Sequence, residues 1–149
     1  MMNNIQEILK LLPHRYPFLL VDRITEFEPN DYLVAVKNVT VNEPCFTGHF
    51  PEQPVLPGVL QLESMAQATA LLAFKTLEAT GRELKENGIF LFAGIDKARF
   101  KMPVMPGDQM LIHCKLLREK SGMWKAEAKI TVDGKLACFA ELLAAYRDV

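Results

Sequence analysis

The sequence predicts an α+β domain in which an antiparallel sheet of about six strands wraps around one long helix. The chain has 149 residues, half of them apolar, so a single globular domain over residues 1–149 is expected. Residues 59–77 are rich in helix formers and contain neither glycine nor proline. Strand-like runs separated by turn residues lie before and after this helix. Wrapping the sheet around the helix covers both the helix and one sheet face.

The first third of the chain predicts a short helix followed by a hairpin. Apolar residues recur at helical spacing over residues 5–12, and Pro13 ends this amphipathic helix. Residues 18–28 and 32–40 are rich in β-branched and apolar side chains, and the Pro-Asn-Asp sequence at 29–31 is typical of a turn.

The rest of the chain predicts a loop, the long helix and four strands. Residues 42–57 contain four prolines and one glycine, which favours a loop held by packing. Apolar residues cover most of the circumference of the helix, so it should be buried on several sides. A charged segment, 81–88, connects it to the strands. We expect these four strands at 89–100, 109–119, 123–132 and 136–146, with turn residues between them.

Composition and charge exclude several classes of protein. A formal net charge of −1 gives no reason to expect nucleic-acid binding. The N-terminus lacks the features of a secretory signal, and no apolar stretch approaches the roughly 20 residues of a membrane helix. The three cysteines, Cys45, Cys114 and Cys138, lie far apart and indicate free thiols in a reducing compartment. We therefore expect a soluble, cytoplasmic protein.

Glu63 is unusual because it lies on the apolar helix. Three and four positions away the helix offers only apolar residues and Gln67, so no cation on the helix can pair with it. Burying an unpaired carboxylate costs several kcal/mol unless the group takes up a proton. Glu63 is therefore a candidate acid, unless it faces water or pairs with a cation from elsewhere in the chain.

His49 is a candidate base in the proline-rich loop. Histidine is the side chain best suited to accept a proton near neutral pH. A lone loop histidine is more often a surface residue, but Gly48 and Pro51 constrain the backbone here and Phe50 provides an apolar anchor.

Pro57 and Gly58 precede the long helix. Backbone N–H groups at a helix start carry partial positive charge and can hold a polarised oxygen, although such a pair often marks a helix start alone. Together with His49 and Glu63, they supply a base, an acid and an oxyanion site within fifteen residues.

These residues resemble a known family. The segment 48–51 (Gly-His-Phe-Pro), Pro57-Gly58 and Glu63 reproduce the G-H-F-P…P-G-x-x-x-x-E pattern of the β-hydroxyacyl-acyl carrier protein dehydratases, the FabZ family. Further segments similar to that family lie at residues 11–23, 93–100 and 106–108, so the resemblance covers nearly the whole chain.

The resemblance implies a hot-dog fold and a shared active site. In that family two protomers pair their sheets edge to edge, and three such dimers form a hexamer. Each site combines the histidine of one chain with the glutamate of its partner, and the acyl chain lies in an apolar tunnel at the dimer interface. Leu91 stands where members often carry tyrosine near the tunnel wall, so neither chain-length preference nor gating is predicted.

The implied reaction is the dehydration of (3R)-3-hydroxyacyl-acyl carrier protein to the trans-2-enoyl thioester, in type II fatty-acid biosynthesis. His49 would take the α-proton while the N–H of Gly58 polarises the thioester carbonyl. Glu63, kept protonated by apolar surroundings, would donate to the departing hydroxyl. No metal or redox cofactor is needed. Glutamate in place of the aspartate of related dehydratase-isomerases favours dehydration without isomerisation.

The implied partner, acyl carrier protein, is acidic and would bind a cationic rim. Alternation along one predicted strand should place three cations on a common face: Lys97, Arg99 and Lys101. A second cluster surrounds a turn and comprises Lys115, Arg118, Lys120 and Lys125. His14 and His113 are assigned to structural roles.

Two other functions remain open. Related hot-dog proteins hydrolyse thioesters with an acidic residue on the same helix, but the presence of both His49 and Glu63 argues against hydrolysis. A non-catalytic protein that binds acyl carrier protein is the third reading, although no feature of the sequence indicates a damaged site.

Overall fold

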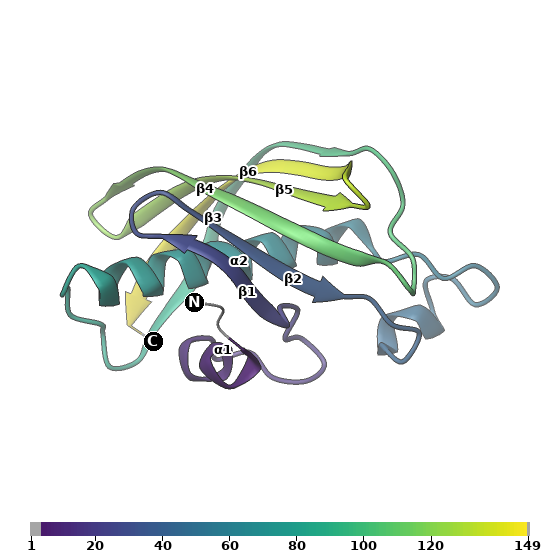
Figure 1. Ribbon diagram of the computed structural model, residues 1–149, viewed down its shortest axis with the longest axis horizontal. Helices are drawn as coiled ribbons and strands as arrows, with labels where there is room; N and C mark the ends of the chain where they lie inside the picture. Colours follow the sequence, from purple (N-terminus) through teal and green to yellow (C-terminus); the bar gives the residue numbers. More distant parts are fainter. Residues whose placement is uncertain (1–3, 149) are drawn as a thin grey trace.

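A six-stranded antiparallel sheet curves over one long helix, α2 (Gly58–Ala79), in the computed structural model, which describes residues 4–148 (Figure 1). The strand order is β1-β2-β4-β5-β6-β3. The strands are β1 (Arg23–Glu28), β2 (Tyr32–Asn38), β3 (Gly88–Phe100), β4 (Gln109–Lys120), β5 (Met123–Val132) and β6 (Lys135–Asp148). The predicted α+β architecture is confirmed.

The core lies between α2 and the inner face of the sheet. Met65, Leu71 and Leu72 of α2 are almost completely buried, and they pack in one cluster with Ile112 of β4 and Ile130 of β5. The short helix α1 (Ile5–Leu11) contacts α2 and lies below it in Figure 1, while β4, β5 and β6 lie above. The long helix is therefore buried on several sides, as its apolar circumference predicts.

The predicted strand 18–28 is wrong in its first five residues, because regular pairing begins only at Arg23. The backbone of this segment bonds instead to a side chain of α2. The amide of Gln67 accepts from the N–H of Leu20 at 2.8 Å and donates to the carbonyl of Phe18 at 2.8 Å. The segment is thus fixed against the helix, close to Glu63.

The predicted loop 42–57 contains one short 3-10 helix, η1 (Pro44–Thr47), directly before His49. The backbone N–H of His49 donates to the carbonyl of Cys45 at 3.1 Å, and the N–H of Val55 donates to the carbonyl of His49 at 3.0 Å. These two hydrogen bonds hold the backbone of His49 to the residues before and after it in the loop.

Strand β3 lies at one edge of the sheet, and within residues 4–148 it pairs with β6 alone. Four large apolar side chains along it are 40% exposed or more: Leu91, Phe92, Ile95 and Phe100. An open edge with exposed apolar side chains is a surface suited to pairing with another strand.

The three cysteines are free thiols, as predicted. Burial raises the pKa of Cys114 to about 12 and that of Cys138 to about 11, and burial also raises the pKa of Cys45. Because the thiolate is the reactive form of cysteine, the raised pKa values do not favour any of these three thiols as a nucleophile.

Within residues 4–148, no helix combines the length and apolar character that crossing a bilayer requires.

Candidate active site

The His49 ring is held in one tautomer. Its Nδ1 lies 2.7 Å from the carbonyl oxygen of Val55. A carbonyl can only accept a hydrogen bond, so Nδ1 carries a proton, and in the neutral form of the ring the lone pair is on Nε2. The Phe50 ring stacks on the imidazole with ring centroids 4.0 Å apart. Sequence and structure therefore agree on a fixed histidine, and its free nitrogen is a proton acceptor.

His49 and Gly58 line a common pocket of about 540 Å³. Gly58 is the first residue of α2, so its N–H has no acceptor within the helix, and no side chain caps this end. A Cβ atom at Gly58 would lie 2.7 Å from the Phe100 ring, so a larger residue here would require that ring to shift. The base and the predicted oxyanion donor therefore face the same space.

Glu63 is largely buried, with 17% of its side chain exposed, and receives a hydrogen bond within the helix. Its Oε1 accepts from Nε2 of Gln67 at 2.9 Å. Because Oε1 of Gln67 accepts a backbone N–H, the nitrogen of this amide must face Glu63. Nε2 of His14 lies 3.4 Å from the same carboxylate oxygen. Glu63 therefore has a partner from elsewhere in the chain, His14, which is a cation only when its ring is protonated.

This arrangement around Glu63 is not apparent from the sequence. The assignment of His14 to a structural turn gives no contact with Glu63, because nothing in the sequence indicates that the turn folds onto α2. In sequence, Gln67 is only an uncharged neighbour on the helix. The spacing of Glu63 and Gln67, four residues apart on one helix, was the available signal, since such pairs face each other.

His49 and Glu63 do not line the same pocket in the single chain. Glu63 lies in a smaller pocket with His14, Gln67 and apolar residues that include Leu91. This pocket has no lining residue in common with that of His49. Strand β3 contributes to both pockets, with Phe100 in that of His49 and Leu91 in that of Glu63.

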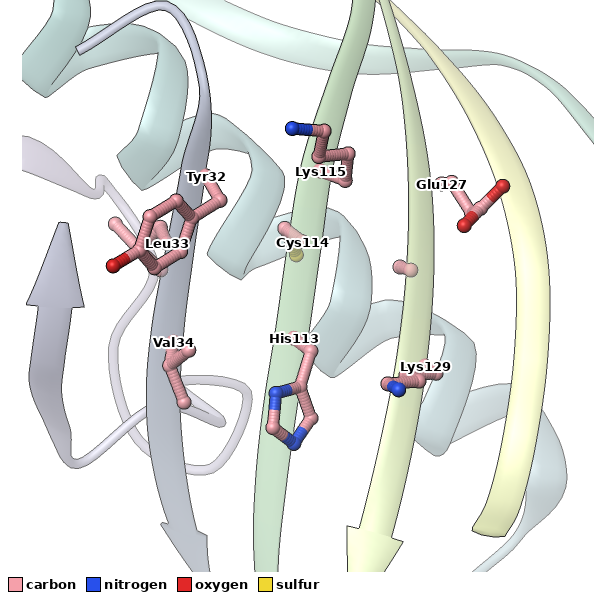
Figure 2. Close-up of a pocket in the computed structure, with 9 residues that line it drawn as sticks. Tyr32, Leu33, Val34, His113, Cys114, Lys115, Glu127 and Lys129 are labelled. Atoms are coloured by element: carbon pink, nitrogen blue, oxygen red, sulfur yellow. The ribbon is translucent and has the colours of Figure 1, made fainter. Parts of the chain in front are cut away.

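A third pocket lies on the outer face of the sheet, across β2, β4 and β5 (Figure 2). His113 lines it, with Nε2 3.2 Å from the hydroxyl of Thr131, and α2 lies behind the strands. Burial, assisted by the positive charge of Lys129, lowers the pKa of His113. Neither His49 nor Glu63 borders this pocket, which agrees with a structural role for His113.

The predicted cationic rim follows β3 less regularly than a strict alternation. A bulge between Asp96 and Arg99 interrupts the regular register with β6, and all three cations of the rim are exposed. Lys97 adopts a positive φ within it and pairs with Glu141 at 3.1 Å, which lowers the pKa of Glu141. Of the three predicted rim residues, only Lys101 lines the His49 pocket. In the second cluster, Lys115 pairs with Asp31 and Lys125 with Glu141.

Gln67→Leu is expected to destabilise the protein by about 2 kcal/mol, because the backbone groups of Phe18 and Leu20 lose their buried partners. Urea unfolding of the two proteins measures the difference. An unchanged free energy of unfolding would show that water replaces the Gln67 amide without cost.

The arrangement of sheet and central helix defines the hot-dog class of proteins. A dehydratase heterocomplex, ApeI:P from Xenorhabdus doucetiae, aligns with a TM-score of 0.78 at 17% identity over 95% of this chain and 91% of that chain. A thioesterase from Haemophilus influenzae aligns with a TM-score of 0.59 at 17% identity, over 84% and 77% of the two chains. At such identities the likeness shows the fold alone.

Sequence comparison identifies the family within this class. The family model of the FabA-like domain matches residues 12–141. The 3-hydroxyacyl-[acyl-carrier-protein] dehydratase FabZ of Pseudoalteromonas translucida is 59% identical over 97% of this chain and 94% of its own. The FabZ of Pasteurella multocida is 60% identical over 95% and 90% of the two chains. The chain therefore belongs to the FabZ family of FabA-like dehydratases.

Proposed function

We propose that this protein dehydrates 3-hydroxyacyl-acyl carrier protein to the trans-2-enoyl thioester in fatty-acid biosynthesis. The observation that carries the proposal is the His49 ring, whose Nδ1–H is bound to Val55 so that Nε2 is a free base beside the N–H of Gly58. The relatives at 59% and 60% identity are named for this reaction, which supports it. The free thiols agree with a cytoplasmic location, which we propose as well.

Each step of the reaction has a residue suited to it. Nε2 of His49 takes the α-proton, and the N–H of Gly58 stabilises the negative charge that develops on the thioester oxygen. The C–O bond at the third carbon then breaks, and Glu63 gives its proton to the departing hydroxyl, which leaves as water. His49 ends with one proton more and Glu63 with one fewer, and solvent exchange restores both. Dehydration changes no net oxidation state, so the balance requires no redox cofactor.

We further propose that each site combines two chains. The base and the acid line separate pockets in one chain, yet both must reach the same substrate. The open, apolar edge of β3 supports pairing of two protomers through this strand, and residues at or next to β3 border both pockets. His49 then acts with Glu63 of the partner subunit. A hexamer of three such dimers, which the family resemblance implies, stays a prediction.

Product analysis tests the proposed reaction. The protein is incubated with a 3-hydroxyacyl thioester of several chain lengths, and enoyl product and free thiol are quantified. We expect the trans-2-enoyl thioester without free thiol. Release of free thiol would identify a thioesterase, and an unchanged but bound substrate would identify a non-catalytic binder. A shifted double bond in the product would reveal isomerisation.

Charge reversal at the rim is expected to weaken turnover of the protein-borne substrate selectively. Lys101 lines the open His49 pocket, and Arg99 is exposed two residues before it. Lys101→Glu or Arg99→Glu should therefore lower kcat/KM on acyl carrier protein more than on a small thioester, with a difference that shrinks as salt is added. Lys135→Glu, at the exposed start of β6, is the control. Equal losses on both substrates would indicate damage to the pocket instead.

A further inference from the structure

One buried polar atom beside the His49 pocket lacks a partner. Within residues 4–148, the fully buried side-chain nitrogen and oxygen atoms without a hydrogen bond are Nδ1 of His14 and Oε1 of Gln61. Gln61 lies on α2, is 3% exposed and lines the pocket that holds His49 and Gly58. Buried polar groups without a partner are rare in folded proteins, so each requires an explanation.

The fold gains no hydrogen bond at the buried oxygen of this carboxamide. A buried polar atom without a hydrogen bond weakens a protein relative to an apolar side chain of similar size. Gln67, six residues further along the same helix, shows the contrast, because its amide makes three hydrogen bonds. A ligand in the pocket is the partner that would satisfy Gln61.

The pocket restricts which part of a ligand Gln61 can meet. Among residues 4–148, its side-chain polar groups come from His49, Gln61 and Lys101, and the other side chains that line it are apolar. Gln61 follows Gly58 by three residues, which places it on the same helix face about 4.5 Å further along the axis. It therefore lies next to the N–H that receives the thioester carbonyl.

We propose that the Gln61 carboxamide binds an amide of the arm that carries the thioester, and so selects amide-bearing acyl thioesters. This inference rests on the proposed dehydratase function. A carboxamide offers a donor and an acceptor, which match the N–H and carbonyl of a secondary amide. The substrate hydroxyl is assigned to Glu63, which borders the other pocket, and the acyl chain has no polar group to offer. Lys101, which is exposed, lines the same pocket.

The test compares Gln61→Leu with the wild-type protein on two small substrates. One is the N-acetylcysteamine thioester of 3-hydroxybutyrate, whose amide nitrogen is two carbons from sulfur. The other is the pentyl thioester, which has the same chain length and no amide. Wild type should favour the first by about tenfold in kcat/KM, a factor that corresponds to ~1.4 kcal/mol. In Gln61→Leu the ratio should fall to about one, mainly through a higher KM for the amide-bearing substrate.

Stability separates this role from a structural one. Gln61→Leu should unfold at the same temperature as wild type or higher, because it removes a buried unpartnered group. Gln67→Leu is the matched control on the same helix, and it should lower stability and affect both substrates alike. A lower unfolding temperature or a weakened oligomer in Gln61→Leu would show that the amide pairs within the protein or across its interface, which would overturn the inference.

The substrate ratio decides the remaining outcomes. If Gln61→Leu slows both thioesters equally, or leaves the wild-type ratio intact, Gln61 does not recognise the amide. Wild-type protein that dehydrates neither thioester nor the carrier-bound substrate would overturn the proposed function itself, and this role with it. The two failures are therefore distinguishable.

Discussion

His49→Ala is expected to lower kcat/KM for a 3-hydroxyacyl thioester by about a thousandfold, within the range that general acid–base catalysis contributes. The substitution removes the imidazole that lines the pocket containing Gly58. Wild type should show a bell-shaped pH profile, because one group must be unprotonated and the other protonated in the same site. Steady-state kinetics across pH measures both effects.

A second histidine provides the control for this experiment. His113 is also partly buried, but it borders the separate pocket on the outer face of the sheet. His113→Ala should therefore retain near-normal turnover. If His49→Ala instead keeps near-normal turnover and the wild-type pH profile, His49 is not the base and the proposed mechanism fails.

The sequence predicted the elements of the fold well because local chemistry determines them. The helix formers of residues 59–77 and the turn residues between the strands lie within a few residues of the observed boundaries. The start of β1 was wrong because Gln67, more than forty residues away, binds that backbone. The bulge in β3 was missed for a related reason, since register depends on the neighbouring strand β6.

A residue of the candidate site could be predicted where its chemical type differs from that of its neighbours in the sequence. Glu63 stands out as a carboxylate on an apolar helix, and the structure places it in a pocket. His14 and Gln61 do not stand out, because a histidine in a turn and a glutamine on a helix are ordinary in sequence. Only the folded chain shows that His14 reaches Glu63 and that the amide oxygen of Gln61 is buried without a partner.

The shared site predicts that two inactive variants restore activity when they assemble together. In an isologous dimer both sites are equivalent, and each would contain one chain's His49 and the partner's Glu63. A His49→Ala chain paired with a Glu63→Ala chain then has one site lacking both groups and one site that is complete. Homodimers of either variant have no complete site.

Refolding an equal mixture of the two variants should therefore recover about a quarter of wild-type activity. Random pairing makes half of the dimers mixed, and each mixed dimer has one of its two sites intact. If both groups came from the same chain, no pairing would rebuild a site, because every chain lacks one of them. Each variant refolded alone is the control for residual activity, and wild type refolded by the same protocol sets the scale. A mixture that stays inactive while wild type recovers would place His49 and Glu63 in one chain's site, despite the separate pockets that they line.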